Sequence, residues 1–283
     1  MAIHQLTERV WYSDPVAAGD RPVLGIAAGE RSSLLIDGGN SPAHVGELLS
    51  AGLPIPPMVA IALTHWHWDH CFGAVSTGLP VIACRETERK LRWMRSLAWT
   101  DAAIQQRVAA GTEMEFCREN IAIEWPGDDR KIQVPTASRV YAEGITLDLG
   151  GLTARLLPVE SDHAPDCRVV HLVEEKAVFL GDSLYLNMDR EPWYRSVAKT
   201  RRLLTALLAL DADWYVPAHH GLYDREGFRR YAETMLRLSY AAGGAEDLAG
   251  AERLYTALTG KAPTEDDREV LGEYLNARRY GKR

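Results

Sequence analysis

The segment 64–70, THWHWDH, most constrains what this chain can fold into. It holds three histidines and an aspartate, and it comes at the end of MVAIAL, an apolar run of strand length. Such a run predicts a strand buried on both faces, which would deliver the histidines at its carboxyl end. Residues i and i+2 of an extended segment point the same way, so His65 and His67 can reach one metal ion. If a helix follows, Asp69 and His70 can serve a second metal ion nearby.

A metal centre needs further ligands, and three later motifs each place a candidate after an apolar run. His163 follows LTARLLPVE, Asp182 follows AVFLG, and His219 or His220 follows WYVPA. Loops just beyond buried strands are where a rigid scaffold holds functional side chains. Imidazole and carboxylate suit zinc, iron and manganese. Each motif alone also fits an ordinary loop residue, but together with segment 64–70 they form one coherent ligand set.

Short strand-like runs separated by turns fill most of the chain, and two stretches differ from this pattern. Residues 85–120 carry apolar side chains at helical spacing and predict a helical insert. Residues 224–283 have a purely helical pattern, with Thr264 and Asp267 as a capping-box-like start to the last helix. We therefore expect one α/β layered domain over residues 1–223 and a C-terminal helical extension.

The composition restricts the partners and the compartment. The net charge of −7 and the pI of about 5.7 argue against nucleic acid or an anionic membrane as a partner, since both favour a basic surface. No apolar stretch reaches the roughly 18 residues of a membrane span, and we expect no secretory signal. The four cysteines form no CxxC pair, so reduced thiols in a cytoplasmic protein are the simplest interpretation. The expected partner is a small-molecule substrate, and the helical extension could also join the subunits of a homo-oligomer.

Over roughly residues 8–221 the sequence resembles the metallo-β-lactamase-fold superfamily. Five motifs carry the resemblance and occur in family order: LLIDGG with Asp37, THWHWDH, the loop with His163, GDS with Asp182, and PAHHG. The resemblance implies an αββα sandwich with a dinuclear metal site at one edge of its two sheets. It also implies two divalent ions, for which zinc fits the histidine-rich set and iron or manganese is an alternative.

The same resemblance implies how the ligands divide between the two ions. Three histidines hold one ion, an aspartate and two histidines hold the other, Asp182 bridges both, and Asp37 supports the site without binding metal. The usual spacing after proline selects His219, although a shift by one residue to His220 stays open. The implied ligands besides Asp182 are His65, His67 and His163 for the first ion, and Asp69, His70 and His219 for the second.

The ligand types also narrow the subfamily. The best-known metallo-β-lactamases have a cysteine among the ligands of the second metal, whereas here the GDS position is the aspartate Asp182. The set is similar to that of glyoxalase II-type thioesterases, lactonases and phosphodiesterases. The triplet WDH at 68–70 resembles glyoxalase II in particular. The residues after His219 and the C-terminal region do not match that enzyme, so a glutathione thioester is not the expected substrate.

We therefore expect a dinuclear metal-dependent hydrolase. A hydroxide bridging two metal ions would attack a small ester, lactone, thioester or related carbonyl substrate, and Asp69 would orient it or move a proton. A small-molecule phosphodiesterase is the alternative enzyme. A non-catalytic metal-binding or interaction protein is the alternative of another class, although structural metal sites usually close at four ligands.

Side chains around the site have two interpretations each. Arg85, Arg89 and Arg92 share one face of a predicted helix, which is either solvated or forms an anion-contacting rim. A group of aromatic residues could line an apolar substrate pocket or pack in the ordinary core. These aromatic residues are Trp93, Trp99, Tyr185, Trp193, Tyr194 and Tyr223.

Overall fold

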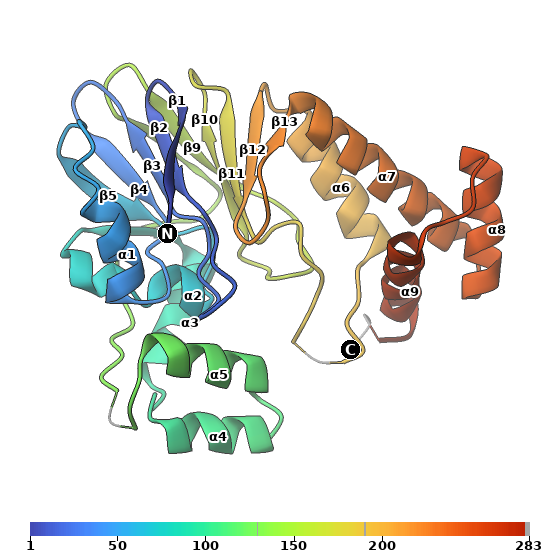
Figure 1. Cartoon of the computed structure of the whole chain (residues 1–283), viewed down its shortest axis with the longest axis horizontal. Helices are drawn as coiled ribbons and strands as arrows, with labels where there is room; N and C mark the ends of the chain where they lie inside the picture. Colours follow the sequence, from blue (N-terminus) through green and yellow to red (C-terminus); the bar gives the residue numbers. More distant parts are fainter. Residues whose placement is uncertain (129, 190, 281–283) are drawn as a thin grey trace.

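The computed structural model describes residues 1–128, 130–189 and 191–280. The last positions of the predicted helical extension, 281–283, lie outside the described residues. Two β-sheets pack face to face, and helices cover the outer face of each (Figure 1). The predicted αββα sandwich with a C-terminal helical region is therefore confirmed.

The first sheet contains seven strands among the described residues, in sequential order. The first to the fourth strand pair antiparallel, and the fourth to the seventh strand pair parallel. The run QLTERVWY forms two strands because the chain turns at residues 8–9. The strands are β1 (Ile3–Thr7), β2 (Val10–Ser13), β3 (Gly25–Ala28), β4 (Ser33–Ile36), β5 (Met58–Ala62), β6 (Val81–Cys84) and β7 (Ala137–Tyr141).

The second sheet is antiparallel except for one parallel pair, β11 with β12. The run RVYAEGITLDL is split between the two sheets, because the chain crosses from one sheet to the other before Ile145. The strands are β8 (Ile145–Asp148), β9 (Thr153–Pro158), β10 (Arg168–Leu172), β11 (Ala177–Gly181), β12 (Trp214–Pro217) and β13 (Tyr223–Asp224).

Three apolar layers hold the sandwich together. Side chains such as Leu34 and Val170 fill the space between the sheets, Leu35 faces the helices on one side, and Val169 faces those on the other. Alternate residues of a strand point to opposite faces, so these central strands are apolar on both. The predicted helical insert at about 85–120 corresponds to α3, α4 and α5 and extends to Glu124. The helices are α1 (Pro42–Leu49), α2 (Trp68–Cys71), η1 (Ala74–Thr77), α3 (Arg85–Arg95), α4 (Asp101–Ala109), α5 (Glu115–Glu124), α6 (Val197–Leu208), α7 (Arg225–Gly244), α8 (Leu248–Thr259) and α9 (Glu265–Tyr280).

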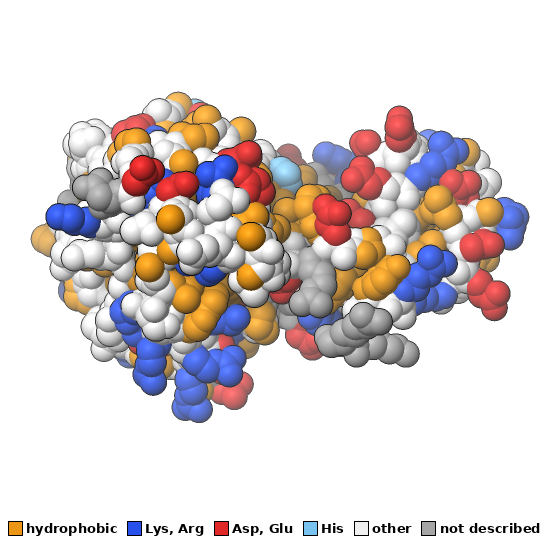
Figure 2. All heavy atoms as spheres, turned by 90° about the horizontal axis from the view of Figure 1, so that it is seen from below, with side chains coloured by type: hydrophobic (Ala, Val, Ile, Leu, Met, Phe, Trp, Pro, Cys, Tyr) orange, Lys and Arg blue, Asp and Glu red, His pale blue; other side chains and the backbone are white. Residues whose placement is uncertain are grey.

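Helices α7 to α9 project to one side of the sandwich, and a narrower waist separates them from it in the face shown in Figure 2. The predicted capping box is present: the Thr264 backbone N–H donates to Asp267, and the Asp267 backbone N–H donates to the Thr264 hydroxyl. Arg195, ahead of α6, pairs with Glu273 of α9 at 3.1 Å and so ties the last helix to the sandwich. Among the described residues, no helix is both long and apolar enough to cross a membrane.

Leu271 of α9 tests how far the packing of these helices stabilises the protein. Its side chain is fully buried in the layer that α7 and α9 share with the second sheet, whereas Leu258 of α8 is 57% exposed. We expect Leu271→Ala to lower the free energy of unfolding by about 2–5 kcal/mol. Leu258→Ala should lower it by less than about 0.5 kcal/mol. Urea denaturation followed by circular dichroism measures both. Equal losses of unfolding free energy in the two variants would contradict the packing of α9 on the second sheet.

Candidate metal centre

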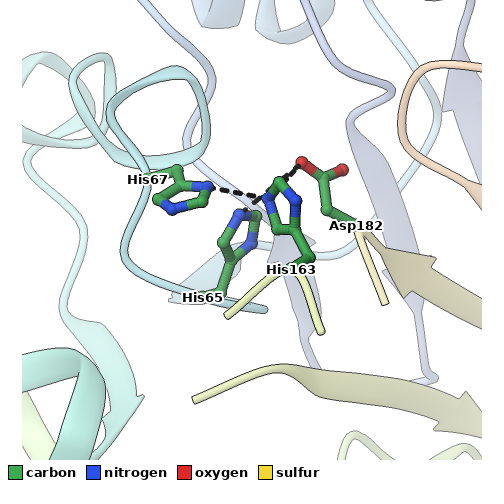
Figure 3. Close-up of side chains that lie close together, drawn as sticks. All are labelled: His65, His67, His163 and Asp182. Atoms are coloured by element: carbon green, nitrogen blue, oxygen red, sulfur yellow. Dashed lines mark hydrogen bonds and ion pairs between the residues drawn. The ribbon is translucent and has the colours of Figure 1, made fainter. Parts of the chain in front are cut away.

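Loops from both sheets converge at one edge of the sandwich, and four side chains form the first cluster there. His65 and His67 follow β5, His163 follows β9, and Asp182 follows β11. Figure 3 shows these four side chains lying close together. Their potential ligand atoms all lie within 4.8 Å of one another. His67 Nδ1 and His163 Nε2 are 2.8 Å apart, and His163 Nε2 is 3.1 Å from Asp182 Oδ2.

A second cluster adjoins the first and shares Asp182 with it. His70 Nε2 is 3.1 Å from Asp69 Oδ2, and His219 Nε2 is 3.2 Å from the same oxygen. His219 belongs to this cluster, whereas His220 is exposed and stacks near Tyr185 instead. The structure therefore brings together all seven candidate side chains, and of the two adjacent histidines it is His219 that lies in the cluster.

Asp182 divides its two oxygens between the clusters. Oδ2 lies 3.1 Å from His163 Nε2 and 3.6 Å from His65 Nε2. Oδ1 lies 3.4 Å from His70 Nε2 and 3.6 Å from His219 Nε2. A carboxylate in this position can hold one cation with each oxygen.

The local backbone explains how these side chains are presented. β5 ends at Ala62, so His65 and His67 lie in the extended segment beyond it, and α2 begins at Trp68. Asp69 and His70 therefore project from a helical turn, as expected. At the end of β11, Gly181 has φ +50°, and a Cβ there would lie 2.6 Å from Thr64 Oγ1. Only glycine lets β11 approach the Thr64 segment this closely before Asp182.

Asp37 lies behind the second cluster and fixes it from β4. Its carboxylate accepts hydrogen bonds from the Thr64 backbone N–H at 2.7 Å and from the Thr64 hydroxyl at 2.9 Å. Its Oδ2 also lies 2.8 Å from His70 Nδ1. A histidine whose Nδ1–H donates to a carboxylate presents Nε2 as a lone pair toward a metal. Asp37 therefore lies in the supporting position that the family resemblance implies for it.

The electrostatics of the two clusters differ. Burial, followed by repulsion from His163, lowers the pKa of His67 to about 3, so this ring is neutral and keeps a lone pair available to a cation. Burial opposes protonation of His219, but Asp182 and Asp69 outweigh it and raise the pKa of His219 to about 10. Burial opposes ionisation of Asp182, but the charges of His70 and His219 hold its pKa well below the usual range. The carboxylates of the second cluster therefore create a negative electrostatic potential that favours cations.

The donor set fits divalent metal ions. His65 Nε2, His70 Nε2 and Asp182 Oδ1 are buried and lack a hydrogen-bond partner among the described residues. Unpaired buried polar atoms are costly, so they mark positions built for another group. Histidine nitrogens with aspartate oxygens suit zinc, and the carboxylates also accommodate iron or manganese.

One neighbour of the site escaped the sequence analysis. Asp20, in the connection between β2 and β3, places Oδ1 3.4 Å from His219 Nδ1. Burial, followed by repulsion from Asp69, raises the pKa of Asp20 to about 7. The segment PVAAGDRP around it reads as an ordinary turn, and its only local signal is Gly-Asp, which is typical of positive φ.

The aromatic side chains expected at the rim divide between the two interpretations. Tyr185 faces the centre, with its ring 5.8 Å from that of His163 and 5.9 Å from that of His219. Trp99 instead packs on Phe72 in the buried core. Trp93 is 44% exposed.

A cation and two indoles meet beside His67. The Trp66 ring lies 4.5 Å from the His67 ring and 5.8 Å from that of Trp93. Lys90 of α3 places Nζ 4.6 Å from the Trp66 ring, and the described residues offer it no carboxylate within ion-pair distance. Arg85, Arg89 and Arg92 are exposed on another part of α3, which agrees with the solvated face.

Comparisons with solved structures show the same fold in distant proteins. The stereoselective inverting sec-alkylsulfatase Pisa1 from Pseudomonas sp. has a TM-score of 0.67 at 15% identity, over 99% of this chain and 50% of that one. The chain thus spans about half the length of Pisa1. A β-lactamase domain protein from Burkholderia ambifaria has a TM-score of 0.59 at 15% identity, over 99% and 88% of the two chains. The metallo-β-lactamase family protein TTHA1429 from Thermus thermophilus has a TM-score of 0.56 at 21% identity, over 98% and 95%.

The sequence comparisons identify the family. None of the curated proteins matches the chain. Residues 23–219 match the family model of the metallo-beta-lactamase superfamily, which is well over half of the chain. Together with the αββα sandwich and the His/Asp clusters at its edge, this match shows that the chain belongs to the metallo-β-lactamase superfamily.

Proposed function

We propose that the protein is a hydrolase that uses two divalent metal ions, most simply zinc, to cleave a small ester, lactone, thioester or related substrate. The observation that carries the proposal is the position of Asp182, with one oxygen toward each cluster. Two adjacent ligand groups with a shared carboxylate are typical of centres that hold a pair of metal ions. A purely structural metal site usually closes at four ligands and needs no second group beside it.

The side chains of the centre would take different parts in the reaction. When bound, the metal ions would lower the pKa of a water molecule to around 7 and polarise the bond to be cleaved. Asp69 contacts His70 and His219 through Oδ2, which leaves Oδ1 to orient the attacking water or accept its proton. The Tyr185 hydroxyl is buried and has no hydrogen-bond partner among the described residues, so it can donate to the oxygen on which charge develops.

The rim beside His67 favours substrates that combine an apolar body with a negative charge. Trp66 and Trp93 offer aromatic surface, and the Lys90 ammonium lies over both rings. The positive charge of Lys90 beside this aromatic surface favours anionic esters. A small phosphodiester is therefore the second candidate substrate class. Alkyl sulfates join the test panel because Pisa1 is a sec-alkylsulfatase. The four cysteines are free and buried, which supports a reducing compartment such as the cytoplasm.

Metal content tests the centre directly. Untagged wild-type protein should hold close to two metal ions per chain, and Asp182→Asn should lose at least one, because an amide has no charge with which to bridge two cations. Mass spectrometry of zinc, iron and manganese measures this in both proteins. Asp211→Asn, a surface change with a side chain 66% exposed, is the matched control and should keep both ions. A metal-supplemented wild type that retains none would refute the proposal.

Lys90 tests the preference for anionic substrates. We would compare the 4-nitrophenyl ester of hexanoic acid with the mono-4-nitrophenyl ester of adipic acid, which adds a carboxylate. Lys90→Met should raise KM for the charged ester about tenfold, as expected for one charge-assisted hydrogen bond, and leave the neutral ester nearly unchanged. Arg89→Met removes the same charge from the exposed face of α3 and should affect neither ester. Equal changes in KM for the two esters would show that Lys90 does not interact with the charge of the substrate.

A further inference from the structure

Asp20 faces the outer ring nitrogen of His219, as Asp37 faces that of His70, although only the Asp37 contact is a hydrogen bond. Asp37 Oδ2 lies 2.8 Å from His70 Nδ1, and Asp20 Oδ1 lies 3.4 Å from His219 Nδ1. In both histidines, Nε2 points to Asp69 and Asp182. The two histidines of the second cluster therefore each have a carboxylate at the ring nitrogen that faces away from it.

The backbone around Asp20 is held in an unusual conformation. Asp20 has φ +52° and Gly19 has φ +78°, and the short bridge between Val16 and Arg21 closes the turn. Positive φ is uncommon for a residue with a side chain and persists only where the surroundings fix it. The Asp20 side chain is 21% exposed, so its carboxylate is largely enclosed against His219.

The surroundings that fix this turn come from the helical layer. Arg21 donates to Glu124, at the end of α5, and to Glu47 of α1, both at 2.7 Å. The Glu124 side chain is only 4% exposed, and it also accepts from the Ser41 hydroxyl. A Cβ on Gly19 would lie 2.4 Å from Glu124 Oε1, so turn and helix end are in close contact. The residues on both sides of Asp20 are thus anchored to the insert.

We propose that Asp20 is a positioning residue for the second half of the metal centre. Its carboxylate sets the ring orientation of His219 and keeps Nε2 free to bind, and the Arg21–Glu124 ion pair holds that carboxylate in place. The helical insert thereby contributes to metal retention although it supplies none of the seven clustered side chains. This inference rests on the proposed two-metal function.

The test is a zinc titration of metal-free full-length protein against a chromophoric chelator, which yields two binding constants for the wild type. Loss of such a supporting carboxylate typically costs about 10–100-fold in metal affinity. Asp20→Asn should therefore weaken the second constant by that factor and leave the first within about twofold. Glu124→Gln should weaken the second constant in the same direction by a smaller factor. In a parallel titration with cobalt, the visible spectrum of Asp20→Asn should differ from that of the wild type only during addition of the second equivalent.

Asp14→Asn is the matched control, because Asp14 also pairs with a histidine, His4, at 2.8 Å in the same part of the chain but away from the site. It should change neither constant. Two constants in the wild type that Asp20→Asn leaves intact would overturn this inference alone. Fewer than two ions bound by the wild type would overturn the proposed function as well. Equal losses at both sites, or the same loss in Asp14→Asn, would reduce Asp20 to a general stability role and overturn the proposal.

Discussion

The buried carboxylate of Asp37 joins the end of β4 to the segment after β5, and the whole metal centre depends on that link. It accepts two hydrogen bonds from Thr64 and faces Nδ1 of His70, so one side chain sets the backbone before the histidines and a ring within them. Asp37 itself has φ +60°, a conformation that needs such compensation. Asp37 therefore both fixes the backbone at Thr64 and orients the His70 ring.

Much of this arrangement could be predicted from the sequence, because the central parallel strands are continuous apolar runs that end at polar motifs. β5 and β11 are recognisable in this way, and Asp69, His163 and Asp182 are candidate site residues because each comes shortly after such a run. The alternation of side chains in an extended segment placed His65 beside His67. The match to a known family then supplied the grouping of distant motifs, which local patterns alone cannot provide.

What the sequence could not show are contacts between distant segments that carry no motif. Asp20 meets His219 across 199 positions of the chain, and nothing local to PVAAGDRP distinguishes it from a surface turn. The split of RVYAEGITLDL between two sheets escaped for a related reason, since strand patterns do not reveal which sheet a strand joins. Trp99 was ambiguous because a buried indole and a rim indole obey the same local pattern.

The order of the clustered side chains along the chain has a consequence for biosynthesis. The first cluster is complete once residue 182 has been made, whereas the second needs residue 219, which follows β12. Domains generally fold as units while the N-terminal part emerges first from the ribosome. Because the two clusters belong to one sandwich, the sheet that carries Asp182 is incomplete until β12 has been added beside β11. The second cluster therefore forms only with the complete sandwich, since its last side chain, His219, follows the strand that extends this part of the sheet.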